Sequence, residues 1–178
     1  MPARPLREKK VNMAAETGFV MPALASLPWM GAAMGEFGVS PFAPGQSNPR
    51  ITAYHHGTSL HGYDDKVAWC SSFVHWCLGQ ACIKGTGSGL ARSWLDWGEP
   101  LDAPLPGCIV VLSRDDPDGW KGHVGFYLHF DADHVHLLGG NQLEQVRAHF
   151  YPISSVLAYR WPAGLACTLP SQTTLPAE

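Results

Sequence analysis

The spacing of apolar residues changes between the two halves of the sequence, and this change limits the fold more than any other feature. Within residues 69–80, apolar side chains recur at intervals of three and four, at Cys70, Phe73, Val74, Cys77 and Leu78. This spacing is typical of a helix with one buried face. Residues 108–112 form a continuous apolar run instead, and Val124, Phe126 and Leu128 alternate with other residues, as strands do. The sequence therefore predicts an α+β fold, with helices first and an antiparallel sheet after them.

Shorter elements surround this central helix. Further helices are predicted over residues 27–39, 50–58 and 91–97. The first is expected to end at Gly38, and the second has Asn48 as its cap and Pro49 at its first position. Strands are predicted over residues 108–112, 123–128, 134–138 and 156–161.

The size of the chain fits one domain. Its 178 residues, of which 46% are hydrophobic and 15% charged, are enough to fill a single core. The N-terminal end mixes basic, polar and small residues, and the C-terminal end is polar and interrupted by prolines. We therefore predict a flexible tail over residues 1–22, a domain over 23–163 and a second flexible tail over 164–178.

Charge and hydropathy exclude several classes of partner. With 12 basic and 15 acidic residues the formal net charge is −3, which argues against an electrostatic grip on nucleic acid. No apolar run reaches the length of about 18 residues that a membrane span needs. The basic residues 1–10 are not followed by a clean apolar stretch with a small-residue cleavage site, so we predict no signal peptide and synthesis in the cytoplasm.

The five cysteines do not predict a disulfide framework or a metal site. Their number is odd, and Cys70 and Cys77 would lie roughly 10 Å apart along one helix, beyond disulfide reach. The sequence also lacks the paired spacings that structural zinc sites favour. We expect no metal and no other cofactor.

The sequence contains, in this chain order, a cysteine, a histidine and an asparagine that together could support thiol chemistry. Cys70 stands at the predicted start of a helix, His123 lies between Gly122 and Val124 on a predicted strand, and Asn141 follows two glycines. A thiol attacks a carbonyl as its thiolate, so it needs a helix N-terminus and a histidine that takes its proton. A polar residue that orients the histidine completes such a site.

Four sequence blocks carry a family resemblance. They are Ala-Trp-Cys-Ser-Ser-Phe-Val at 68–74, Pro-Gly-Cys-Ile-Val-Val at 106–111, Gly-His-Val-Gly-Phe-Tyr at 122–127 and Leu-Leu-Gly-Gly-Asn-Gln at 137–142. Together they resemble the NlpC/P60 and CHAP superfamily of cell-wall cysteine hydrolases over roughly residues 27–162. The Asn-Pro-Arg-Ile at 48–51 is similar to a CHAP-like bacterial and phage subgroup. The resemblance implies a papain-like fold in which the nucleophile helix packs on the antiparallel sheet.

Carried over by position, the resemblance makes Cys70 the nucleophile, His123 the general base and Asn141 the residue that orients the imidazole. Relatives often use a histidine as the third member, which leaves His136 as the alternative to Asn141. A protonated His123 and the helix dipole would both favour the thiolate.

Two further residues near the nucleophile have expected roles. The backbone amide of Cys70 is the first expected oxyanion donor, and Tyr63 in the preceding loop is the candidate for the second. Trp69, which directly precedes the nucleophile, either packs the core or lines a substrate groove.

The resemblance implies hydrolysis of amide bonds in bacterial peptidoglycan through an acyl-enzyme. The bond would lie within the stem peptide or between muramic acid and its first alanine. Relatives act in a phage lysis or tail apparatus, or as effectors that a type VI secretion machine injects into the periplasm of a rival cell. In the second case the partners would be a secretion-machine component and a cognate immunity protein over the Cys70 cleft.

Two other classes of function compete with this interpretation. One is a catalytically inactive wall-binding or adaptor module, for which replacing Cys70 would change nothing. The other is a zinc hydrolase that uses His123, His134 and His136, which would lose activity with a chelator and ignore thiol alkylation.

Overall fold

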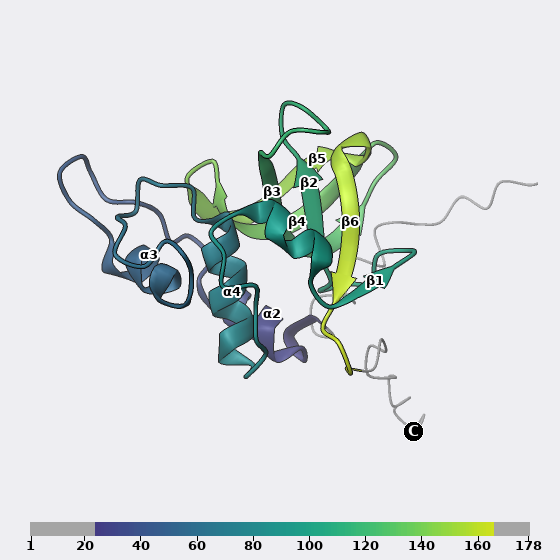
Figure 1. Ribbon diagram of the computed structural model, residues 1–178, viewed down its shortest axis with the longest axis horizontal. Coiled ribbons are helices and arrows are strands. Elements are labelled where there is room, and N and C mark those ends of the chain that lie inside the picture. Colours follow the sequence, from purple (N-terminus) through teal and green to yellow (C-terminus); the bar gives the residue numbers. More distant parts are fainter. Residues whose placement is uncertain (1–23, 166–178) are drawn as a thin grey trace, which may run out of the picture.

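The computed structural model describes residues 24–165, and the α+β architecture expected from the sequence is confirmed (Figure 1). The predicted N-terminal tail at 1–22 lies outside these residues, as does all of the predicted C-terminal tail except 164 and 165. Helices lie to one side of a single sheet, and no helix within 24–165 has the length and apolarity that a membrane crossing requires.

The predicted elements occur in the predicted order, and three elements absent from the prediction are added to them. The helices are α2 (Pro28–Gly35), α3 (Pro49–Tyr54) and α4 (Cys70–Gln80), with 3-10 turns η1 (His55–Gly57), η2 (Ala91–Asp96) and η3 (Ile153–Ser155). The strands are β1 (Glu99–Leu101), β2 (Ile109–Ser113), β3 (Gly122–Phe130), β4 (His134–Gln142), β5 (Gln145–Pro152) and β6 (Val156–Trp161). The three elements absent from the prediction are β1, β5 and η3. The six strands form one antiparallel sheet in the order β1-β6-β2-β3-β4-β5.

Helix α3 begins where its sequence predicts. The side chain of Asn48 accepts a hydrogen bond from the Arg50 amide, and Pro49 occupies the first helical position, where no amide hydrogen is needed. Ile51 and Tyr54 are buried on its inner face, and so is His55, which opens the following turn. The predicted helix over 50–58 is thus an α-helix that tightens into a 3-10 turn.

Helix α4 lies in the centre of the molecule and packs against β3 and β4. Its apolar positions are all buried, and the ring centroids of Phe73 and Phe126 lie 6.5 Å apart where the helix meets β3. Gly140 on β4 permits this close packing, because a Cβ there would stand 2.5 Å from the Trp69 ring and 2.6 Å from Phe73 Cβ. Helix packing thereby fixes Cys70 against the middle of the sheet.

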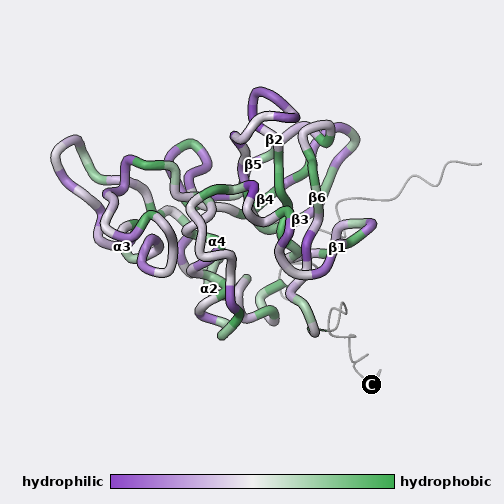
Figure 2. Tube along the Cα trace, in the orientation of Figure 1, coloured by the Kyte–Doolittle hydropathy of each residue, from purple (hydrophilic) through white to green (hydrophobic). Residues whose placement is uncertain are grey.

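Strand β3 is buried on both of its faces, whereas the sequence predicted one open face. Residues 123–127 are all buried, with Phe126 facing α4 and Gly125 lying under the Leu137 side chain. On the second face, the ring of Tyr151 on β5, a strand absent from the prediction, lies 5.0 Å from the His123 ring. Figure 2 shows hydrophobic colour along β2, whereas the loop that joins β2 to β3 is hydrophilic.

Candidate active site

Cys70 is the first residue of α4, so its sulfur lies at the helix N-terminus as predicted. The residue is 5% exposed. The backbone amides of Val124, Ser71 and Cys70 itself lie close enough to the sulfur to favour its thiolate form. Because Val124 follows His123 directly, these contacts place the thiol beside the strand segment that carries the predicted base.

Opposing effects act on the protonation of this thiol. Burial raises the pKa of the Cys70 thiol, whereas the three amides and the positive charge of Arg114 lower it; burial prevails, so that the thiol is protonated at neutral pH. The helix N-terminus and the amides would favour the thiolate most once a base takes the proton.

His123 lies on β3 and is 9% exposed. Its ring centroid is 5.0 Å from that of Tyr151 on β5. Burial lowers the pKa of His123 to about 4, with a smaller effect in the same direction from Arg114. The structure therefore does not supply the protonated imidazole that would favour the thiolate; burial favours the neutral form, which can act as a base.

Gln142 is the residue that orients His123. Its Oε1 lies 3.1 Å from His123 Nε2, and its Nε2 donates to the carbonyl oxygens of Leu137, at 3.1 Å, and Arg147. Both carbonyls can only accept, so the amide nitrogen must face them and Oε1 must face the imidazole. His123 Nε2 therefore carries the hydrogen, and Nδ1 keeps the lone pair that can accept a proton.

A glycine makes room for this arrangement. A Cβ at Gly139 would stand 3.2 Å from Gln142 Cδ and 3.3 Å from Oε1, so the amide lies directly over the glycine. The Gly-Gly pair of the fourth sequence block thus serves two sides of β4, since Gly139 faces Gln142 and Gly140 faces α4.

The structure places Gln142, and not Asn141, at the hydrogen bond to His123. The β4–β5 register shifts between Gly139 and Gln142, and Asn141 adopts a left-handed conformation with φ of 57°. The bulge breaks the alternation of side chains along the strand, which the sequence pattern did not reveal. A glutamine next to the predicted asparagine was the only signal available.

His136, the alternative third member, lies six residues before Gln142 on β4, roughly 20 Å along a strand. Its Nε2 forms a hydrogen bond with Asp131 at 2.9 Å, and its ring stacks on His129 with centroids 4.1 Å apart. His136 therefore belongs to the opposite end of the sheet.

The other two candidates also have clear positions. Trp69 is buried in an aromatic cluster with Tyr54 and Phe73, so its side chain is part of the core. Tyr63 is 54% exposed in the loop before α4. Within residues 24–165, no hydrogen bond involves the Tyr63 side chain.

A cavity of about 210 Å³ opens beside Cys70. Cys70 contributes to its wall together with Leu90, Arg114, Trp120 and Lys121. Cys70 is thus nearly buried by its neighbours, and its exposed part lies in the wall of this cavity.

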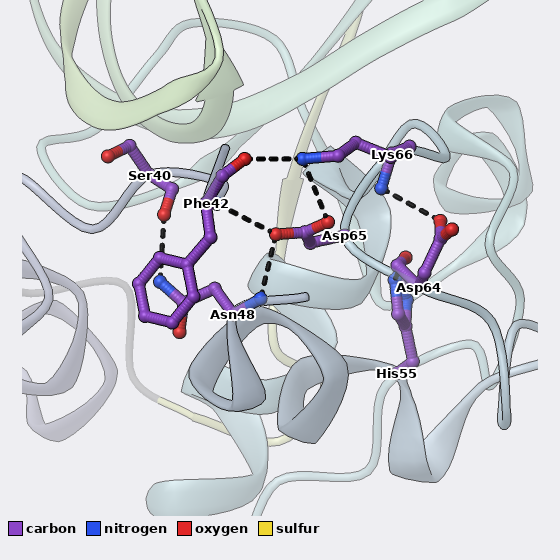
Figure 3. A network of polar contacts seen from close by, with 7 residues as sticks. All are labelled: Ser40, Phe42, Asn48, His55, Asp64, Asp65 and Lys66. Atoms are coloured by element: carbon purple, nitrogen blue, oxygen red, sulfur yellow. Dashed lines mark hydrogen bonds and ion pairs between the residues drawn. The ribbon is translucent and has the colours of Figure 1, made fainter. Parts of the chain in front are cut away.

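A polar network fixes the loop that leads into α4 (Figure 3). The Asp65 carboxylate is buried, and one of its oxygens accepts hydrogen bonds from the backbone amides of Asn48, at 2.8 Å, and Phe42, at 3.0 Å. Lys66 Nζ lies 3.2 Å from the other oxygen. On the far side of the loop, His55 bonds the Asp64 carbonyl and Ser72 in the first turn of α4. The network therefore ties the chain before Cys70 to α3 and to α4.

No group of three histidine, cysteine, aspartate or glutamate side chains within residues 24–165 is placed to hold a metal ion. The set required by the zinc alternative is not brought together, since His134 and His136 both bond Asp131 whereas His123 bonds Gln142.

Comparison with known proteins gives structural neighbours but no sequence match. No family model and no curated protein matches the chain. Among solved structures, an NlpC/P60 family protein from Bacillus cereus is similar with a TM-score of 0.47 at 15% identity, covering 75% of this chain and 39% of that one.

Two further structures are similar. One, an NLP/P60 family protein described as similar to a lipoprotein, from Staphylococcus aureus, has a TM-score of 0.43, 13% identity and coverage of 78% and 41%. The other, NlpC1 from Trichomonas vaginalis, has a TM-score of 0.44, 17% identity and coverage of 77% and 42%. The chain thus spans about two fifths of the length of these structures.

Proposed function

We propose that this chain is a cysteine hydrolase that cleaves amide bonds of bacterial peptidoglycan. One observation carries the chemistry: the Cys70 thiol lies at a helix N-terminus against the Val124 amide, and the neighbouring His123 is held by Gln142 as the tautomer with a free Nδ1. A thiol, a neutral imidazole and an orienting amide are the parts that nucleophilic acyl transfer needs.

The reaction starts from an uncharged pair. His123 Nδ1 takes the thiol proton as the sulfur attacks the amide carbonyl, and the amides near the sulfur stabilise the negative charge that develops. The carbon–nitrogen bond breaks when the imidazolium returns its proton to the leaving amine, which leaves an acyl-enzyme. Water, deprotonated by the same imidazole, then hydrolyses the thioester and releases the acid.

Gln142 supports each of these steps through its hydrogen bond to His123. Its Oε1 accepts the Nε2 hydrogen and stabilises the imidazolium when it forms, because a carbonyl dipole points at the positive ring. Burial by Tyr151 excludes water from the ring, so the proton passes between the sulfur and the imidazole.

The substrate class is supported by the four sequence blocks that resemble the NlpC/P60 and CHAP superfamily, not by the site geometry alone. The bond cleaved is either one within the stem peptide or the one between muramic acid and its first alanine. The papain-like assignment of the fold is part of the same proposal.

The test is digestion of purified peptidoglycan sacculi, with the released fragments identified by mass spectrometry. We expect wild-type protein to release fragments with new amine and carboxyl ends at one type of bond, and Cys70→Ala to release none. Intact sacculi after treatment with the wild-type protein, or equal digestion by both proteins, would overturn the proposal. The masses also separate an endopeptidase from an amidase.

Delivery to a rival cell by a type VI secretion machine, with a cognate immunity protein as partner, is part of the proposal that rests on the family resemblance alone. A phage lysis or tail hydrolase is the competing origin. Both place the substrate in the cell wall, so the digestion experiment applies to either.

A further inference from the structure

The wall of the cavity beside Cys70 contains two cationic side chains, Arg114 and Lys121, and no anionic one. Lys121 is already occupied, because its Nζ pairs with Asp115 at 2.9 Å. The Arg114 guanidinium has no hydrogen bond or ion pair with any residue in the part of the chain that the structure describes, so its five donors are available to a ligand.

The loop that presents Arg114 is held in place from outside the cavity. The Arg92 guanidinium donates to three backbone carbonyls of this loop, those of Asp116 at 3.0 Å, Pro117 at 2.9 Å and Lys121 at 2.8 Å. η2, which carries Arg92, packs in turn on β2 and β3. Arg114 therefore extends from a loop whose backbone is fixed before a ligand arrives, which lowers the entropic cost of binding.

Arg114 lies close enough to Cys70 and His123 to affect both electrostatically. Its charge acts on both the Cys70 thiol and His123, so the guanidinium lies within electrostatic range of the two. Leu90 and the 72% exposed Trp120 give the same cavity apolar surface. The cavity thus combines one free guanidinium with an apolar wall, next to the sulfur.

We infer that Arg114 binds a carboxylate of the substrate, beside the amide that Cys70 attacks. The planar guanidinium matches a carboxylate through two parallel hydrogen bonds, and no carboxylate of the described chain competes for it in the cavity. Arg114 is then a specificity-determining residue, which selects amides flanked by a free carboxylate. This inference rests on the proposed function.

The first test uses alkylation of Cys70 and needs no knowledge of the natural substrate. Iodoacetate and iodoacetamide form the same bond to sulfur and differ in a carboxylate against a neutral amide. We expect the ratio of their rates, measured by mass spectrometry on the peptide that holds Cys70, to fall roughly threefold to tenfold in Arg114→Gln. The ratio cancels any change in the reactivity of the thiol itself.

Lys84→Gln is the matched control, because it removes one positive charge from the wall of a different cavity, which Lys84 lines together with Trp97. Its rate ratio should equal that of the wild type. An unchanged ratio in Arg114→Gln, an equal fall in both variants, or a Cys70 that neither reagent reaches would each overturn the inference. Arg114→Lys should give an intermediate ratio, since it keeps the charge and loses the two-point contact.

The second test compares synthetic stem peptides that carry a free or an amidated carboxyl group next to the scissile bond. We expect wild-type protein to prefer the free acid in kcat/KM, and Arg114→Gln to lose most of that preference while still cleaving the amidated peptide. Equal preference in both proteins would contradict a role for Arg114. If neither protein cleaves either peptide, the proposed hydrolase activity fails, whereas the alkylation ratio still decides whether Arg114 attracts carboxylates.

Discussion

The proposed chemistry depends on the hydrogen bond between Gln142 and His123, which fixes the tautomer of the imidazole. Gln142→Leu would leave the buried Nε2 hydrogen of His123 without an acceptor and free the ring to rotate. An unsatisfied buried donor costs about 1–3 kcal/mol, so we expect kcat to fall roughly tenfold to hundredfold. The loss should appear in kcat more than in KM, as measured on sacculi or stem peptides.

Asn141 provides the control for this prediction. Its φ of 57° suits glycine, so Asn141→Gly should fold and should keep kcat within about twofold of the wild type. A large fall in kcat for Asn141→Gly together with normal activity of Gln142→Leu would return the orienting role to Asn141 and contradict the geometry.

The pH dependence of the site follows from burial of both reacting groups. Because burial raises the pKa of Cys70 and lowers that of His123 to about 4, the pair is neutral between these values. kcat/KM should therefore stay level from neutral pH down to about 5 and fall as His123 gains a proton near pH 4. An acidic limb near pH 6.5, the ordinary pKa of histidine, would contradict a buried base.

The positions of Cys70 at a helix start and of His123 on a strand could be predicted from the sequence, because hydrophobic spacing defines both elements. The side chain that bonds the imidazole could not. Asn141 and Gln142 are both amides, and only the register shift and the positive φ at 141 decide which of them reaches the imidazole. Such a bulge is set by neighbouring strands and leaves no clear trace in local spacing.

At the scale of elements, two adjacent glycines of β4 contact different parts of the molecule: Gly140 faces the core and Gly139 faces Gln142. A Cβ at Gly140 would meet the Trp69 ring and Phe73, which are packed in the core and cannot retreat. Gly140→Ala should lower the free energy of unfolding by about 1–3 kcal/mol, as overpacking does, in urea denaturation.

Gly139→Ala should affect activity more than stability, in contrast to Gly140→Ala. Its Cβ would press on the Gln142 amide, whose position is fixed by hydrogen bonds to Leu137, Arg147 and His123. We expect the variant to lose activity with a smaller loss of stability than Gly140→Ala. If both variants lose stability equally and neither loses activity once folded, the two glycines do not divide the roles as proposed.

The elements themselves were predictable where hydrophobic spacing is strong. α4, β2, β3 and β6 follow their patterns closely, and β4 begins at the predicted residue but continues to Gln142. β5 was missed because Leu143 and Glu144 make the tight turn before it, both with positive φ, in place of the asparagine and glycine that usually mark such hairpins.

At the scale of the whole molecule, the site lies where the helical half meets the sheet. α4 carries the proposed nucleophile, β3 the proposed base and the end of β4 the amide that bonds it, and Asp65 fixes the loop before α4 through hydrogen bonds. Packing of the two halves therefore sets both stability and the geometry of the site. Loss of that packing should be visible in activity before the protein unfolds completely.

Burial of histidines makes the stability of the whole domain depend on pH. Burial lowers the pKa of His55, His75 and His123 in the folded protein, whereas each returns to about 6.5 on unfolding. Between pH 6.5 and about 4 the unfolded chain therefore binds more protons than the folded one, so the free energy of unfolding falls with falling pH. His123 alone should contribute about 2 kcal/mol of this loss at pH 5.

Urea unfolding at pH 7.5 and pH 5.0 tests this dependence. We expect a clearly lower midpoint at pH 5.0 for the wild type and a smaller difference between the two values for His123→Gln, which keeps a polar side chain but does not titrate. The carboxylates of Glu36 and Asp65 add little to the loss between pH 7.5 and 5.0, because their ordinary pKa values, 4.5 and 3.8, lie below this range; the lowered pKa values of the folded protein reduce its stability only at more acidic pH. Equal midpoints at the two pH values would mean that these histidines accept protons without unfolding, and the neutral imidazole required for catalysis would lose its physical basis.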